Sequence, residues 1–100
     1  MVKYTVTATL ASKDVLAQYT AWLRDGHIRR VVEEGGALQG DFSIASGQDT
    51  VQVISSFVFP DRKACDAYIN GLAVTLRPEG VKLFVDTQKV LKFDRVISDL

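Results

Sequence analysis

The sequence predicts an α+β fold of the ferredoxin-like βαββαβ type, with one four-stranded antiparallel sheet and helices on one face of it. Two patterns lead to this prediction. Four stretches have the alternation of β-strands, and two stretches between them space their apolar residues as amphipathic helices do. Length and composition agree, since 100 residues, 47% hydrophobic and 24% charged, suit one globular domain. We therefore expect a single domain over residues 1–100.

The first strand and the first helical arm are expected within residues 2–36. Residues 2–10 place apolar side chains at the even positions, which predicts a strand. Ser12 can then cap a helix, and Gly26 is expected to end that helix in the left-handed conformation. A second short helical piece at 28–32 should stop at Gly35-Gly36. The arm is thus predicted to be broken once.

A β-hairpin is predicted next. Apolar residues alternate with polar ones over residues 38–44 and indicate a second strand, and residues 46–49 are polar enough for a turn. The third strand is expected at 50–59, where both alternating sets contain apolar residues, Ile54 and Val58 forming the smaller set. Such a pattern is typical of a strand that is buried on both faces.

The rest of the chain predicts a helix and a closing strand. Asp61 is placed to cap a helix whose apolar stripe is formed by Cys65, Tyr68, Ile69, Leu72 and Leu76. Residues 77–80 (Arg-Pro-Glu-Gly) should break this helix. Residues 79–85 fit a short helix or a strand; we expect a helix, because proline is tolerated in a first turn and Leu83 and Phe84 can pack inward. Alternation near 90–97 predicts the last strand.

A sheet of this kind leaves one face without helices. Here that face carries Ile54, Val58 and threonines rather than charges. A second copy of the chain is the simplest cover for it, so we expect a homodimer.

Charge and composition exclude several partners. Twelve Lys and Arg balance twelve Asp and Glu, so the chain lacks the basic footprint of a protein that binds nucleic acid or an anionic membrane. No run of apolar residues approaches the length of a membrane span, and no secretion signal is visible. Cys65 is the only cysteine, which excludes an internal disulfide and suits a reducing compartment. We expect a cytoplasmic protein.

A series of short motifs resembles the DUF4286 family, a domain of unknown function, over nearly the whole chain. The motifs are Trp22-Leu23, His27-Ile28, Val51-Gln52, Asp66-Ala67-Tyr68, Leu76-Arg77, Glu79-Gly80, Phe84 and Val90-Leu91. That family is placed in the dimeric α+β barrel superfamily, in which two ferredoxin-like protomers pack sheet against sheet. Relatives there include antibiotic-biosynthesis-type and haem-degrading monooxygenases, EthD-like proteins and muconolactone isomerases. The resemblance implies fold and dimer better than chemistry.

This chain departs from the family pattern at three places. Family members often show paired histidines where this chain has Gly26-His27, a tyrosine where it has Val53, and a further histidine where it has Leu72. If those polar groups serve chemistry elsewhere, this member has lost part of it or performs something different.

Four residues are candidates for a ligand site. His27, the only histidine, is a weak candidate for a general base or a hydrogen-bonding group at a cavity mouth; the alternative is an imidazole bonded to backbone at a helix end. Trp22 and Tyr68 can stack on a ligand or belong to the core. Arg95 can hold an anion or form a surface ion pair. The hydroxyls of Thr5, Thr7, Thr9, Ser55 and Ser56 either enter a lumen or pair across the sheet.

Other chemistries find no support in the sequence. One histidine and one distant cysteine give no spacing for a metal site, and the glycines at 35, 36 and 40 lack the spacing of a phosphate-binding loop. Haem ligation by His27 would rest on analogy with relatives alone, so we expect no cofactor. Cys65 lies on an apolar stripe, where a thiol acts as a small hydrophobe.

Two hypotheses follow. The first is a homodimeric barrel that binds a small, largely apolar molecule between sheet and helices; cofactor-independent oxygenation, isomerisation or cyclisation is added by analogy with the relatives. The alternative is a non-catalytic interaction module whose interior is filled by its own side chains.

Overall fold

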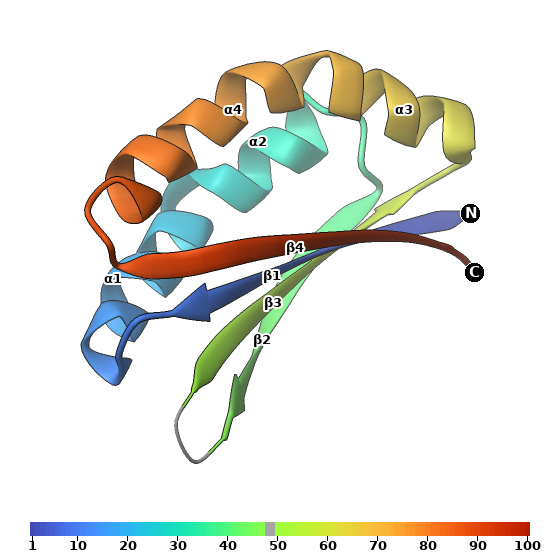
Figure 1. The fold of residues 1–100 in the computed structure, drawn as a ribbon. Coiled ribbons are helices and arrows are strands. Elements are labelled where there is room, and N and C mark those ends of the chain that lie inside the picture. Colours follow the sequence, from blue (N-terminus) through green and yellow to red (C-terminus); the bar gives the residue numbers. More distant parts are fainter. Residues whose placement is uncertain (48–49) are drawn as a thin grey trace.

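The computed structural model of the protein describes residues 1–47 and 50–100. The predicted turn at 46–49 therefore lies partly outside the described residues. The chain runs through a strand, a first helical arm, two strands, a second helical arm and a last strand (Figure 1). Their bounds are β1 Val2–Leu10, a 3₁₀ turn η1 Lys13–Val15, α1 Leu16–Trp22, a π-helical turn η2 Leu23–His27, α2 Ile28–Glu33, β2 Gln39–Ser46, β3 Val51–Phe59, α3 Arg62–Asn70, α4 Leu72–Gly80, a π-helical turn η3 Val81–Val85 and β4 Val90–Asp99.

The four strands form one antiparallel sheet in the order β2-β3-β1-β4. The helices cover one face of this sheet (Figure 1). The period-two pattern of β1 explains the orientation, because Val2, Tyr4, Ala8 and Leu10 are buried towards the helices, opposite the buried odd-numbered residues of β3. The prediction of an α+β fold with four antiparallel strands is confirmed.

The space between sheet and helices holds two hydrophobic clusters. One surrounds Phe57 and Phe59 and includes residues of β1, α2, α3 and α4. The other surrounds Tyr19 and Phe84 and includes residues of α1, β3 and the start of β4. Cys65, fully buried in the first cluster, is a free thiol as the sequence predicts. Because the core is divided, packing between the two clusters is the place where space can remain.

The first helical arm is broken once, at Gly26, as predicted, but the conformation at the break differs from the prediction. Gly26 has non-helical backbone angles, φ 179° and ψ −33°, rather than left-handed values, and helical geometry resumes at His27 and continues into α2. Ser12 makes no side-chain cap, because the Val15 N–H donates to the Ser12 carbonyl instead. The predicted stop after α2 is correct: Gly36 has φ +85°, which glycine adopts without steric cost.

The second helical arm breaks at a different residue from the one predicted. The break lies at Gly71, between α3 and α4, whereas Pro78 stays inside α4, which continues into η3. Pro78 lacks the N–H that the Val74 carbonyl would accept, but both residues are exposed, so water can serve that carbonyl. Phe84 is buried as expected, while Leu83 is 44% exposed, contrary to the prediction. The predicted cap at Asp61 is confirmed, since its carboxylate accepts the Ala64 N–H at 2.8 Å.

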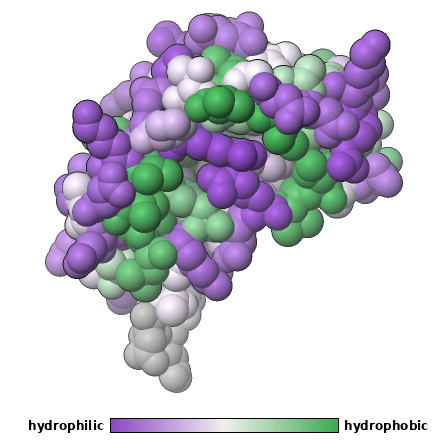
Figure 2. Space-filling model, turned by 45° about the horizontal axis from the view of Figure 1, so that its top comes forward, coloured by the Kyte–Doolittle hydropathy of each residue, from purple (hydrophilic) through white to green (hydrophobic). Residues whose placement is uncertain are grey.

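The two faces of β3 are not equally buried. Ile54 and Val58 lie on the face away from the helices and are only half-buried, so burial on both faces is wrong for the single chain. On the helical side, exposed residues such as Val74, Val81 and Leu83 are interspersed with charged ones, and Figure 2 shows hydrophobic patches separated by hydrophilic side chains. Within the part of the chain that the structure describes, no helix is long and apolar enough to cross a membrane.

Candidate functional site

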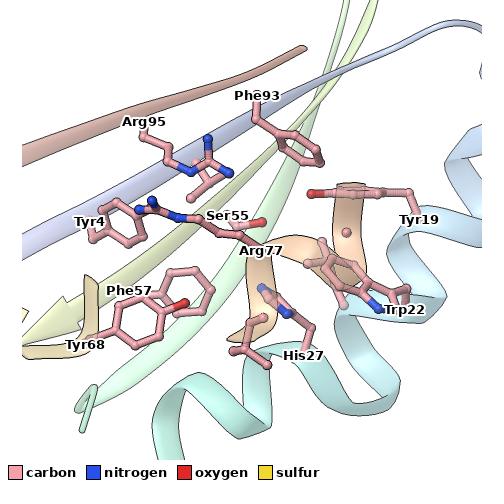
Figure 3. A pocket seen from close by; sticks show the side chains of 14 residues that line it. Tyr4, Tyr19, Trp22, His27, Ser55, Phe57, Tyr68, Arg77, Phe93 and Arg95 are labelled. Carbon is pink, nitrogen blue, oxygen red and sulfur yellow. The ribbon is translucent and has the colours of Figure 1, made fainter. Parts of the chain in front are cut away.

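A cavity lies between the two hydrophobic clusters, under the helices and over the centre of the sheet. Its volume is about 40 Å³, which is room for about three water molecules. Strands β1, β3 and β4 supply its floor, and α1, η2, α3 and α4 supply its roof (Figure 3). The side chains labelled in Figure 3 are Tyr4, Tyr19, Trp22, His27, Ser55, Phe57, Tyr68, Arg77, Phe93 and Arg95.

Two arginines enter this cavity from opposite sides. Arg77 comes from α4 and is half-buried; its Nη2 donates to the Tyr4 hydroxyl at 3.4 Å, and its Nε is buried without a hydrogen-bond partner among the described residues. Arg95 comes from β4, opposite Val6, and its guanidinium carbon lies 5.5 Å from the centroid of the Phe93 ring. Figure 3 shows both side chains directed into the space between sheet and helices.

Hydroxyl groups surround the arginines. Ser55 of β3 is 2% exposed, and its Oγ has no hydrogen-bond partner within residues 1–47 and 50–100. Burial raises the pKa of Tyr19 above its ordinary range, although Arg95 opposes part of that rise. Burial, followed by the neighbouring Tyr4, raises the pKa of Tyr68 to about 12. At neutral pH these tyrosines are therefore protonated and can donate hydrogen bonds.

The kink at Gly26 within η2 places Trp22 and His27 at one end of the cavity. Trp22 precedes the kink and His27 follows it, and their rings stack with centroids 4.2 Å apart and planes inclined by 21°. Burial, with a smaller effect of Arg30, lowers the pKa of His27 to about 4. Its imidazole is therefore neutral at pH 7.

A second hollow lies on the outer side of the stacked rings. Trp22 and His27 line both spaces, and the outer one is completed by Asp25, Gly26, Arg30 and Glu79. The volume of this hollow is about 300 Å³, compared with about 40 Å³ for the inner cavity. Arg30 Nη1 and the Glu79 carboxylate lie 3.0 Å apart beside it, which joins α2 to α4. The stacked pair therefore separates a small inner cavity from a wider outer hollow.

The structure brings all four residues predicted for a ligand site to this cavity: His27, Trp22, Tyr68 and Arg95 line it. His27 lies at a helix end, as the alternative predicts, because it is the first residue after the kink at Gly26 and precedes α2, but its imidazole makes no hydrogen bond to backbone within the described residues. Arg95 makes no ion pair in the part of the chain that is described, so the surface-pair alternative is not seen.

The predicted set of hydroxyls is divided between the two faces of the sheet. Ser55 faces the cavity, whereas Ser56 and the threonines at 5, 7 and 9 have the opposite parity and lie on the face without helices. Thr9 accepts a long hydrogen bond of 3.4 Å from the Gln52 amide, which agrees with pairing across the sheet.

Arg77, Tyr4 and Tyr19 were missed as site residues. Arg77 follows Ile69 and Ala73 at four-residue steps, so its position continues the apolar side of the second helical arm, where a charged residue is unusual. That position was a signal in the sequence. Tyr4 and Tyr19 occupy ordinary core positions, and nothing in their spacing distinguishes them.

The residues offer no metal site within the described parts of the chain, where no group of three or more His, Cys, Asp and Glu gathers. What the cavity offers is a set of hydrogen-bond donors, two cations and aromatic surfaces.

Comparison with known proteins assigns the chain to a family without assigning an activity. No curated protein matches it. The family model described as "Domain of unknown function (DUF4286)" matches residues 1–100, so the chain belongs to the DUF4286 family.

Proposed function

We propose that this protein binds a small, largely apolar molecule in the cavity between its sheet and its helices. The observation that supports the proposal is the cavity itself, which lies between two well-packed clusters and is lined by aromatic rings and by polar groups that face inward. Binding sites commonly combine an apolar lining with a few converging polar groups. An interaction module with a filled interior, the alternative, would have no need to keep such a space.

The ionisable groups of the cavity favour binding over proton transfer. His27, whose pKa is lowered to about 4, is a weak base at neutral pH, and Tyr68, whose pKa is raised to about 12, is a weak acid there. If the protein also catalyses an oxygenation, isomerisation or cyclisation without a cofactor, its side chains act by orienting the substrate and by stabilising negative charge that develops on it. Arg77 and Arg95 are the groups placed for the second task.

We further infer a ferredoxin-like protomer and a homodimeric barrel. The strand order β2-β3-β1-β4 and the helices on one face support the first inference. The second is supported by the outer face of the sheet, where Ile54, Val58 and Val96 lie among threonines and no helix covers them. A cytoplasmic location fits this inference, because the single cysteine is a free, buried thiol.

A matched pair of substitutions tests the dimer. Val96 is 60% exposed on the outer face of β4, and Val74 is 62% exposed on the helical side. Sedimentation equilibrium of the wild type should give twice the chain mass of 11.0 kDa. Val96→Lys should shift the protein to monomer, since a buried unpaired ammonium opposes association, whereas Val74→Lys should not. A wild-type protein that sediments as a monomer would contradict the proposed homodimeric barrel.

Titration of the fluorescence of Trp22 tests the ligand site. Trp22 is the only tryptophan and borders both spaces, so an apolar aromatic compound that enters should change its emission saturably. His27→Ala should weaken that binding by about 1 kcal/mol through loss of the stacked imidazole and its hydrogen-bonding capacity. If no compound in a broad apolar set changes the Trp22 emission saturably, the proposal of a ligand site is wrong, and the alternative of a non-catalytic interaction module remains.

A further inference from the structure

The cavity contains positive charge without a counter-charge. Arg77 and Arg95 line it, and none of its lining residues is Asp or Glu. Within the described chain neither guanidinium takes part in an ion pair, whereas Arg29, Arg30 and Arg62 each lie within 4.0 Å of a carboxylate. Arg24, outside the cavity, also makes no ion pair among the described residues, so the distinguishing feature of the cavity is that two arginines and no carboxylate line the same space.

Two donors of the cavity are buried and unpartnered. Arg77 Nε and Ser55 Oγ have no hydrogen-bond partner among residues 1–47 and 50–100, and the Ser55 side chain is almost completely shielded from solvent. Most buried donors in proteins have an acceptor, because a donor that loses its hydrogen bond to water and gains none inside the protein raises the free energy of the folded state. Donors that face an open space instead of a protein acceptor are placed to receive an acceptor from a ligand.

We propose that the ligand of this cavity carries a carboxylate: its oxygens accept hydrogen bonds from Arg77 and Ser55, and Arg77 and Arg95 balance its charge. This inference rests on the proposed function, because it specifies the ligand of the same cavity. The planar guanidinium matches the planar carboxylate, and hydrogen bonds between charged partners are the stronger ones. Tyr19 and Tyr68, both protonated at neutral pH, add donors and no negative charge.

The size and the remaining lining restrict the ligand further. Besides the polar groups, the walls are apolar, with Val6, Leu23, Phe57 and Leu76. Space for about three water molecules holds the carboxylate and the first carbons of an organic acid, and the rest of its chain must extend towards the hollow beyond Trp22 and His27. A phosphate group would place more oxygens and more charge against these apolar walls. The chemistry therefore fits a short carboxylic acid with an apolar chain.

Nuclear magnetic resonance of the full-length, ¹⁵N-labelled protein tests this inference directly. Butyrate is the probe, and butyramide is its neutral counterpart of nearly the same shape. The Arg77 Nε–H resonance, assigned by its disappearance in Arg77→Lys, should move downfield and saturate with butyrate. Butyrate should bind about tenfold or more tightly than butyramide, because only the carboxylate gains charge-assisted hydrogen bonds.

Matched variants connect the effect to the cavity. Arg77→Gln and Arg95→Gln should each weaken butyrate binding by about tenfold. Arg62→Gln removes an exposed arginine of α3 that pairs with Asp66 outside the cavity, and it should leave binding unchanged. Ser55→Ala provides a second variant that alters one hydroxyl only and should weaken binding several-fold, with unchanged circular dichroism showing that each variant is folded.

The outcomes separate this inference from the proposed function. Butyrate and butyramide binding equally tightly would overturn the inference that the ligand carries a carboxylate. Binding of neutral aromatic compounds but not of butyrate would do the same. Both outcomes would still support ligand binding in the cavity. Displacement of butyrate by inorganic phosphate that binds more tightly would also overturn it. If Arg62→Gln weakens butyrate binding as much as Arg77→Gln and Arg95→Gln do, butyrate is attracted nonspecifically by positive charge, and the proposed carboxylate site is wrong. No response to either probe, together with no response in the Trp22 titration, would overturn the proposed function itself.

Discussion

Removal of a single buried hydroxyl should stabilise this protein. The Ser55 side chain is 2% exposed and its Oγ has no hydrogen-bond partner in the described chain. Such a hydroxyl is stripped of its water contacts on folding and costs about 1–3 kcal/mol. Ser55→Ala removes the hydroxyl and leaves the Cβ in place, so it should raise the free energy of unfolding by about 1 kcal/mol, less where cavity water serves the hydroxyl.

The neighbouring residue provides a matched control. Ser56 lies on the same strand, next to Ser55, but its side chain is on the face without helices and is only half-buried. Ser56→Ala makes the same chemical change on the same strand, so it carries a similar change in strand propensity. The scale of strand propensities spans about 1 kcal/mol in total. The difference between the two variants therefore isolates the buried hydroxyl.

Urea denaturation of both variants, followed by circular dichroism, measures this difference. Ser55→Ala should unfold at higher urea than Ser56→Ala by an amount that corresponds to about 1–2 kcal/mol. If Ser55→Ala is as destabilised as Ser56→Ala or more, the hydroxyl is well satisfied in the folded protein, and the reasoning that a ligand must supply its partner is wrong. A stabilised Ser55→Ala that also binds butyrate less well would show that the site is kept at the expense of stability.

Three further predictions follow from the same structure. The pKa of His27 is lowered to about 4 in the folded chain, below its unfolded value of 6.5, so the unfolded chain takes up the proton first as the pH falls. Urea unfolding should therefore show wild-type stability falling from about pH 6.5 towards pH 4, and a smaller fall in His27→Gln, whose carboxylates titrate alike; equal pH profiles would contradict the burial of the imidazole. Cys65 is fully buried, and a thiol reagent should label it slowly in the native state and quickly in denaturant. Asp61→Ala removes the cap on the Ala64 N–H and should lower the free energy of unfolding by about 1 kcal/mol, whereas an unchanged urea midpoint would show that the cap is dispensable.

The sheet could be predicted from the sequence because each strand carries its own signal. Alternation along β1 determines which side chains face the helices, and any other assignment would bury threonines and expose Tyr4. The break at Gly26 could be predicted from the glycine, but its conformation could not, because helical geometry resumes directly after it. The break predicted near Pro78 is wrong, because Pro78 lies where the carbonyl that it deprives of a donor is exposed to water. Those outcomes depend on tertiary surroundings that spacing does not record.

The candidate site shows the same division. Trp22 and His27 could be placed together from their spacing around Gly26, although the stacking of their rings across the kink could not be predicted. Arg95 could be singled out as a cation on the last strand. That Arg95 and Arg77 line the same cavity could not be predicted, because it depends on how the helices pack on the sheet.

The position of the cavity explains how the fold tolerates its polar groups. Each hydrophobic cluster has members that do not line the cavity: Phe59 and Cys65 are fully buried in one, and in the other Val53 is fully buried and Phe84 almost so. The unfavourable free energy of the unpartnered donors is therefore confined to the seam, the space between the two clusters. A chain under selection for stability alone could fill this seam with aliphatic side chains and lose two unpartnered donors at once. That Arg77 and Ser55 occupy it instead is the strongest reason for regarding the seam as a binding site.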